Sequence, residues 1–315
     1  MWRMAIAIVL CLVLLVGAVG CAPEQEAAMS EQEDTDAGFR KTVLYYRSDE
    51  GFVVPVMRMI PWEEGIGRAA VSYLIGTEEN QKSVAPMGLN TVLPDGVSVE
   101  LRIKDGLATL NIINLSEYPD AVSEQAMVDA VVSTLLEFPS IDSVQLKFDG
   151  KLKNKLPNGT LVGEPITGVA LNGEQEDIDT SADGSYNKLT LYFPNQSCSL
   201  NVPVTRYVQN IRTFETAVGE LIKGPAIDGL RNCFPEGTEL LSCSIEDTKA
   251  SVDLSKEFLS VSDTPGLAPA AYEALCLTAM QFGPIEELSL TVEGKAFDFG
   301  SERANLPVFA NEFDS

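Results

Sequence analysis

The chain has 315 residues, a formal net charge of −24 and no histidine. This charge argues against nucleic acid as a partner, because a phosphate backbone attracts Lys and Arg, and against tight docking on anionic lipid headgroups. The lack of histidine removes Ser-His-Asp and Cys-His catalysis and the commonest zinc ligand. Carboxylate pairs and Ser-Lys can catalyse without histidine, so its absence disfavours an enzyme without excluding one. We expect no catalytic residue, no metal site and no cofactor.

An apolar run from Ala5 to Val19 follows Arg3 and ends close to Cys21. This order is typical of a secretory signal peptide, and the run is short for a spanning helix, which needs about 20 apolar residues. Residues 18–21, Ala-Val-Gly-Cys, resemble a bacterial lipobox, in which a peptidase cuts before the cysteine and the sulfur carries a lipid. We predict a signal peptide over 1–20 and a lipid on Cys21 that holds the protein at the extracytoplasmic face of the cell membrane. An uncleaved N-terminal anchor is the alternative.

The segment after Cys21 is acidic. Between Glu24 and Asp36 there are six acidic residues and no basic one. Such a segment cannot bury enough apolar surface to fold. It predicts a disordered tether over residues 21–40.

The rest of the chain carries one pattern twice, which indicates two similar domains. Apolar residues at 42–46 and 189–193 predict a first strand, and Val-Pro-Val-x-Arg follows at 54–58 and 202–206. A helical pattern, a strand hairpin, a second helical pattern and a last strand come next in both copies. We expect these at 66–74, 97–112, 128–135 and 143–148 in the first copy, and at 214–222, 241–254, 271–282 and 288–292 in the second.

Each copy therefore predicts the order β-β-α-β-β-α-β, an α+β fold with two helices on one face of a small mixed sheet. We expect the first domain over 41–171, an acidic linker rich in Gly and Ser over 172–187, and the second domain over 188–310. The fourth strand of the first copy has two possible registers. Either Asn111-Ile112 or Asn114-Leu115 takes the place that Asp253-Leu254 has in the second copy.

Several motifs of the second copy resemble those of one family. They are Leu-Tyr-Phe at 191–193, Val-Pro-Val-x-Arg at 202–206, Glu-Leu-Ile-Lys-Gly-Pro at 220–225, Phe-Pro-Glu-Gly at 234–237, Asp-Leu-Ser at 253–255 and Val-x-Gly-Lys at 292–295. The chain is similar to GerM-domain lipoproteins of sporulation and spore germination, with two GerM domains in tandem. This resemblance implies a non-catalytic envelope protein of an endospore-forming bacterium, with a fold related to ring-building modules. It also implies partners among other envelope or sporulation proteins, with a ring-like oligomer as one arrangement.

Cysteine and arginine supply the candidate site residues within the two copies. Cys198 and Cys233 lie in polar turns and are candidates for a disulfide, whereas Cys243 and Cys276 fall on core-like positions. Arg58 and Arg206 occupy the same place in the repeat. Each could pair with a local carboxylate or contact a partner protein, and the sequence leaves both open.

Three functions fit these features. The first is a lipid-anchored scaffold that assembles with other envelope proteins. The second is an extracytoplasmic ligand-binding lipoprotein. The third is a module that binds cell-wall glycan, which would need exposed aromatic side chains, with Tyr45, Tyr46 and Tyr192 as the residues to inspect.

Overall fold

The computed structural model describes residues 38–174, 186–300 and 304–312. The predicted signal peptide, Cys21 and nearly all of the predicted tether lie outside the described residues, and so does most of the predicted linker. Within the described ranges, no helix is both long enough and apolar enough to cross a membrane.

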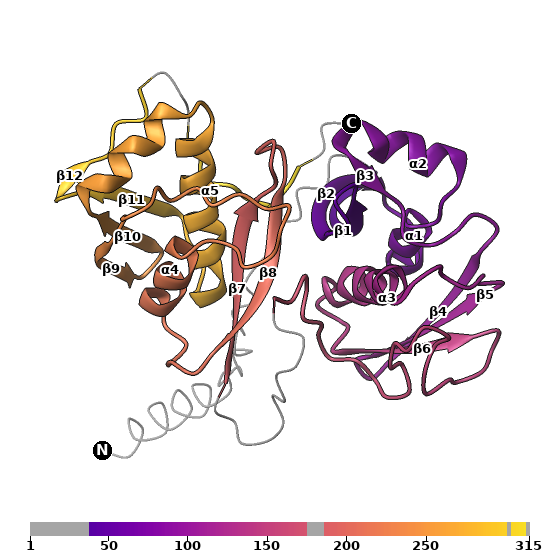
Figure 1. Ribbon diagram of the computed structural model, residues 1–315. Helices are drawn as coiled ribbons and strands as arrows, with labels where there is room; N and C mark the ends of the chain where they lie inside the picture. Colours follow the sequence, from indigo (N-terminus) through magenta and orange to yellow (C-terminus); the bar gives the residue numbers. More distant parts are fainter. Residues whose placement is uncertain (1–37, 175–185, 301–303, 313–315) are drawn as a thin grey trace, which may run out of the picture. The chain divides into compact units, whose positions relative to one another are not determined.

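The strands of the first copy form two sheets (Figure 1). In one, β1 lies between β2 and β3 and is antiparallel to both. In the other, β4 and β5 form an antiparallel hairpin, and β6 is parallel to β5. The elements are β1 (Phe39–Ser48), β2 (Val53–Pro61), α1 (Ile66–Ser72), α2 (Glu78–Val84), the 3-10 helix η1 (Ala85–Met87), β3 (Leu89–Asn90), β4 (Ser98–Lys104), β5 (Leu107–Ile113), α3 (Ala121–Leu136) and β6 (Ser143–Phe148).

The second copy repeats this arrangement with small changes. Strands β7 and β8 form an antiparallel pair, and the larger sheet has the order β12-β11-β10-β9, with β10 and β11 parallel. The elements are β7 (Asn187–Pro194), β8 (Asn201–Val208), α4 (Phe214–Ile222), β9 (Leu240–Glu246), β10 (Lys249–Leu254), η2 (Lys256–Asp263), α5 (Leu267–Ala279), η3 (Met280–Phe282), β11 (Glu287–Val292) and β12 (Lys295–Ala296).

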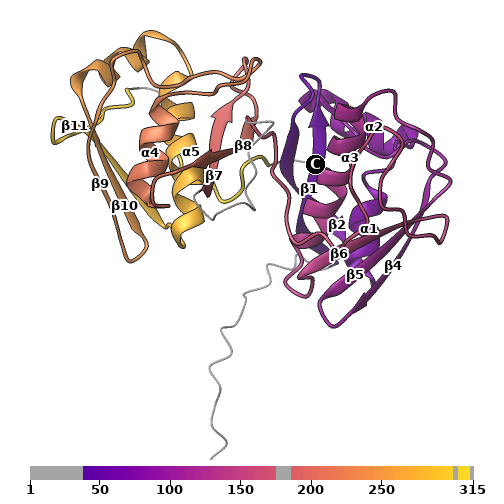
Figure 2. The ribbon, with the colours of Figure 1, turned by 60° about the horizontal axis from the view of Figure 1, so that its bottom comes forward.

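The helices pack between the two sheets of the first copy. Helix α3 contacts β1, β2 and β6, while α1 contacts β1 and β4. Figures 1 and 2 both show α3 and α1 with the β1–β2 strands on one side and the β4–β6 sheet on the other. In the second copy α4 likewise contacts a strand of each sheet, β7 and β9. The apolar core therefore lies on both sides of the helices.

Short sequence signals begin the helices and close the hairpins. The Asp120 carboxylate accepts a hydrogen bond from the backbone N–H of Ser123 at 2.7 Å and so caps α3. At the β4–β5 turn, Asp105 and Gly106 both have positive φ, 50° and 76°, as a two-residue hairpin turn requires. A Cβ at Gly106 would lie 2.0 Å from a carboxylate oxygen of Asp142, so only glycine fits there.

The predicted α+β fold with tandem copies and mixed sheets is confirmed. The prediction of two helices on one face of a single sheet was wrong in one feature. The strands of each copy are divided between two sheets, and the helices contact both sheets. Helix α2 was also not predicted. Of its seven residues only Val84 is buried, so it has no apolar periodicity for a sequence pattern to detect.

The structure also decides between the two registers of the fourth strand. The side-chain oxygen of Asn111 accepts a hydrogen bond from the Gly150 N–H at 2.7 Å, and that of Asp253 accepts one from the Gly294 N–H at 2.9 Å. Asn111 and Asp253 therefore accept a hydrogen bond from the equivalent turn of their copies, the turn that contains Gly150 or Gly294. Asn111 thus takes the place that Asp253 has in the second copy, and its role is structural.

Candidate interaction surfaces

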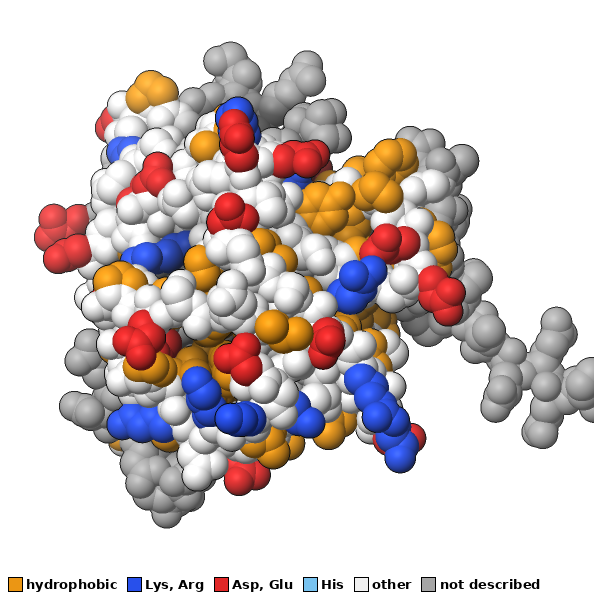
Figure 3. All heavy atoms as spheres, turned by 90° about the vertical axis from the view of Figure 1, so that its right-hand side faces the viewer, with side chains coloured by type: hydrophobic (Ala, Val, Ile, Leu, Met, Phe, Trp, Pro, Cys, Tyr) orange, Lys and Arg blue, Asp and Glu red, His pale blue; other side chains and the backbone are white. Residues whose placement is uncertain are grey.

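The outward side of the β4–β6 sheet carries several cations. Arg102, Lys104 and Lys147 alternate with apolar residues of the opposite side, and Glu100 is the one carboxylate among the strand positions of this side. Figure 3 faces the first copy and shows Lys and Arg side chains gathered along its lower part, where β4–β6 lie in Figure 1. In a chain with a net charge of −24, this is a local basic surface.

The equivalent side of the second copy is acidic. Glu246, Asp253 and Glu287 occupy its strand positions, and the one cation there, Lys249, forms an ion pair with Glu287. Strands β4 and β9 are each at the edge of their sheet, so each has one side of its backbone available to another chain. The two copies therefore present similar shapes with opposite charge.

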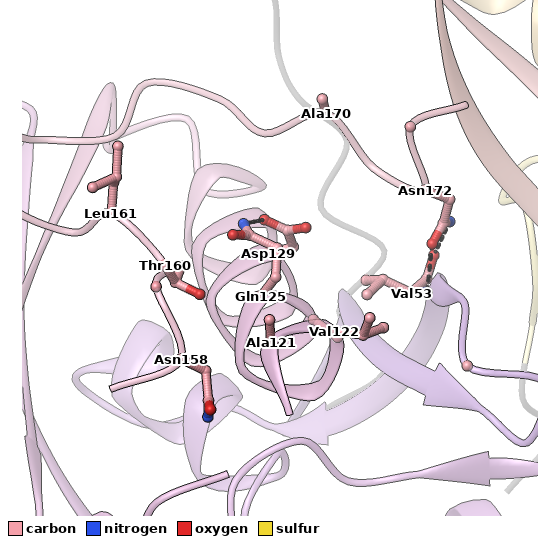
Figure 4. Close-up of a pocket in the computed structure, with 14 residues that line it drawn as sticks. Val53, Ala121, Val122, Gln125, Asp129, Asn158, Thr160, Leu161, Ala170 and Asn172 are labelled. Atoms are coloured by element: carbon pink, nitrogen blue, oxygen red, sulfur yellow. Dashed lines mark hydrogen bonds between the residues drawn. The ribbon is translucent and has the colours of Figure 1, made fainter. Parts of the chain in front are cut away.

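A cavity of about 870 Å³ lies over the first half of α3 (Figure 4). The side chains of Gln125 and Asp129 lie at the helix surface that faces the space between the 158–161 loop and the 170–172 segment. Gln125 donates a hydrogen bond to Asp129 at 2.7 Å, and Asp129 is only 8% exposed. Burial raises the pKa of Asp129 to about 6, although the Gln125 amide and the charge of Lys188 oppose this rise. Since the lining includes no Lys, Arg or aromatic residue, the cavity suits a small polar or cationic group.

The loop that borders the cavity is pinned by a buried carboxylate. Glu124 is 1% exposed and accepts hydrogen bonds from the backbone N–H groups of Asn158, at 3.0 Å, and Thr160, at 3.1 Å. Burial would raise the pKa of Glu124, but the hydrogen bonds from this loop outweigh it and lower the pKa. No sequence pattern identified Glu124 or Asp129. Glu124 accepts its hydrogen bonds from residues 34 and 36 positions away along the chain, and Asp129 is distinguished only by its burial in the folded protein.

Arg58 and Arg206 hold the same place in β2 and β8 but have different surroundings. Arg206 is 7% exposed and pairs with Glu174 at 2.5 Å and with Glu220 at 3.2 Å. Burial would lower the pKa of Arg206, but the two carboxylates raise it. Arg58 donates to the hydroxyls of Tyr46 and Ser83, both at 3.1 Å, and lies over the Tyr73 ring. The ion-pair interpretation thus fits Arg206, and a partner contact by either arginine stays a prediction.

The four cysteines of the second copy are thiols in the structure. Cys276 is fully buried in the core, and Cys243 is half-buried and packs against the core. Cys233 is also buried, which raises the pKa of its thiol to about 12, and the charge of Cys198 acts in the same direction. A disulfide between Cys198 and Cys233 is not formed here and stays a prediction.

The tyrosines that glycan binding would need do not form an exposed row. Tyr46 is fully buried, Tyr45 is buried and donates to the Glu137 carboxylate at 2.7 Å, and Tyr192 is half-buried. In the parts of the chain that the structure describes, no group of three His, Cys, Asp or Glu side chains could hold a metal ion. Among the described residues, the two sheet sides, their edge strands and the cavity are candidate surfaces for a protein or small-molecule partner.

Three similarities with known proteins accompany this geometry. The family described as "Germane: Sporulation and spore germination" matches residues 43–154 and 190–298. The spore germination protein GerM of Bacillus subtilis (strain 168) is 27% identical over 285 residues, which cover 87% of this chain and 77% of that protein. The solved tandem GerMN domains of the sporulation protein GerM from Bacillus subtilis match with a TM-score of 0.68 and 26% identity, over 88% of this chain and 100% of that one.

Proposed function

Since this chain belongs to the sporulation and spore germination (Germane) family, we propose that it is a non-catalytic scaffold with a role in sporulation or germination. We further propose that a lipid on Cys21 holds it at the extracytoplasmic face of the cell membrane, where it assembles with other envelope proteins. The observation that carries the scaffold role is the duplicated module with an edge strand in each copy, β4 and β9, and with opposite charge on the two equivalent sheet sides. Such surfaces join protein subunits by strand addition or by charge complementarity.

The anchor and the scaffold role are tested with two sets of variants in the sporulating host. Cys21→Ala should abolish the incorporation of labelled palmitate and release the protein from the membrane fraction. Ile103→Glu in β4 and Leu241→Glu in β9 add a charge at half-exposed edge positions, 43% and 50% exposed, and should reduce the recovery of cross-linked partners while palmitate labelling stays normal. A wild-type protein that takes up no palmitate would refute the anchor. Normal spore formation and germination after deletion would refute the role.

The cavity over α3 favours one other function, an extracytoplasmic ligand-binding lipoprotein. Its buried carboxylate, Asp129, stands among apolar and amide groups, which together suit an ammonium group on an alkyl chain. If the cavity binds such a ligand, n-butylammonium should raise the melting temperature of the wild type but not of Asp129→Asn. Equal melting temperatures with and without the amine would leave the scaffold as the single proposal.

A further inference from the structure

Two aromatic side chains are exposed where the described chain begins. Phe39, the first residue of β1, is 46% exposed, and Trp62, which follows β2, is 53% exposed. The backbone N–H of Trp62 donates to the Gly38 carbonyl at 2.8 Å. Because Phe39 follows Gly38, this hydrogen bond holds Phe39 and Trp62 at the same end of the β1–β2 ribbon. The Arg40 guanidinium lies 5.6 Å from the centre of the Trp62 ring. We name Phe39, Arg40 and Trp62 the aromatic end.

The composition of the aromatic end suits the boundary between lipid and water. Tryptophan is enriched at that boundary, because its ring is apolar and its indole N–H is a hydrogen-bond donor. An arginine stacked on the ring places its charge at the level of the lipid phosphates. Of the nearby carboxylates, Glu63 lies 3.5 Å from the Arg68 guanidinium and is thereby partly neutralised.

The length of chain between this end and Cys21 limits how far the end can lie from the proposed anchor. Sixteen residues separate Cys21 from Gly38. Whatever conformation they take, they span at most about 60 Å, since one residue extends the chain by about 3.5 Å. A contact that is weak in free solution becomes occupied when a tether keeps its two sides at high effective concentration.

We propose that the aromatic end docks on the bilayer that carries the Cys21 lipid, with Trp62 in the headgroup region. This inference rests on the lipid anchor of the proposed function. The contact is made by aromatic rings and one stacked arginine, so it should form on zwitterionic phosphatidylcholine and gain little from anionic lipid. It is therefore compatible with a chain that carries a net charge of −24.

The chain offers a built-in reporter for this contact, because its two tryptophans are Trp2 and Trp62. Residues 1–21 belong to a separate unit from the residues that carry the aromatic end, so a hexahistidine tag can replace them, and this leaves Trp62 as the only tryptophan. The tag binds phosphatidylcholine vesicles that contain nickel-chelating lipid. On these vesicles, Trp62 emission should shift to shorter wavelength, and it should lose intensity when brominated phosphatidylcholine replaces the ordinary lipid. Phe39→Ser should reduce both effects.

The matched control places a tryptophan at the start of α3, away from the aromatic end, which lies near the end of this helix. Val122 is 66% exposed at the start of this helix, whereas Phe138, whose ring lies 5.9 Å from Arg40, follows its end. The helix separates the two by about 20 Å, at about 1.5 Å per residue. Trp62→Phe with Val122→Trp should show neither a shift nor quenching. Absence of quenching at Trp62, or equal quenching at both positions, would overturn the docking. Because the tag replaces the lipid, this result is independent of palmitate labelling, which tests the anchor.

Discussion

Asp129 shows how a single buried carboxylate can make stability depend on pH. Its pKa is raised to about 6 by burial, whereas an aspartate in the unfolded chain titrates near ~4. Between these values the folded state binds more protons than the unfolded state, so this group lowers stability as the pH rises from ~4 through about 6. The ionised side chain is therefore a cost at neutral pH.

We expect Asp129→Asn to increase the free energy of unfolding at pH 7.5 by about 2 kcal/mol, which is the order that such a change in pKa implies. The gain should disappear toward pH 4, where the carboxyl is protonated in the folded protein. Urea unfolding of both proteins at a series of pH values measures this. A gain that stays constant with pH would show that the charge of Asp129 is not its cause.

Glu124 has the opposite effect, because its pKa is lowered in the folded state. Its charge contributes stability that is present above the pKa of the unfolded chain and is lost as the pH falls through the lower folded value. Glu124→Ala leaves the half-buried N–H of Asn158 and the buried N–H of Thr160 without an acceptor and should cost about 2–4 kcal/mol. Hydrogen exchange should become faster at Asn158 and Thr160. Unchanged exchange at these two amides would contradict the role of Glu124 as the acceptor.

The second strand of each copy shows how one position in a repeated element can take on two roles. In β8, Arg206 sits between Glu174, which precedes the second copy, and Glu220 of α4, whereas in β2 the hydroxyl partners of Arg58 are neutral. Removal of a buried ion-pair partner costs about 3–5 kcal/mol, because the charge left behind is uncompensated. Loss of hydrogen bonds to neutral groups costs about 1 kcal/mol each.

We therefore expect Arg206→Met to lower the free energy of unfolding by about 3–5 kcal/mol, measured by chemical unfolding at neutral pH. A loss of about 1 kcal/mol or less would mean that the ion pairs of Arg206 contribute nothing beyond packing.

At the scale of the whole molecule, the two copies differ most in the charge of their outward sheet sides. The basic side of β4–β6 and the acidic side of β9–β11 can attract each other between molecules, in contrast to the repulsion expected from the net charge of −24. Association should therefore be detectable at low ionic strength by sedimentation and should weaken at high salt, because exposed charges are screened within about 8–10 Å.

The double variant Arg102→Glu with Lys104→Glu should abolish this association. Its control, Lys82→Glu with Lys256→Glu, changes the net charge by the same amount at two other exposed lysines and should associate like the wild type. If the two double variants behave alike, net charge and not the β4–β6 surface governs association.

The periodicity of apolar residues in the sequence predicted most of the secondary structure. The strands at 42–46 and 189–193 and all four helices with an apolar face are present, because burial on one side leaves a regular pattern. The division into two sheets left no such pattern, since alternation shows which side of a strand is buried and not which strand lies beside it. Glu124 and Glu174, one of the two carboxylate partners of Arg206, were likewise out of reach, because each contacts a residue more than 30 positions away along the chain.

The parallel strand pairs constrain the order in which the chain can fold. Strand β5 pairs with β6, which is made later, with Leu107 opposite Ser143. Strand β10 likewise pairs with the later strand β11, with Lys249 opposite Glu287. Until the chain has been made through Phe148, β5 has a neighbour on one side only. Every strand of the first copy's two sheets lies before residue 187, so these sheets can close during synthesis while the second copy is still incomplete. A nascent chain that stalls between β5 and β6 would present an open strand edge, which is the form most prone to aggregation and to capture by a chaperone.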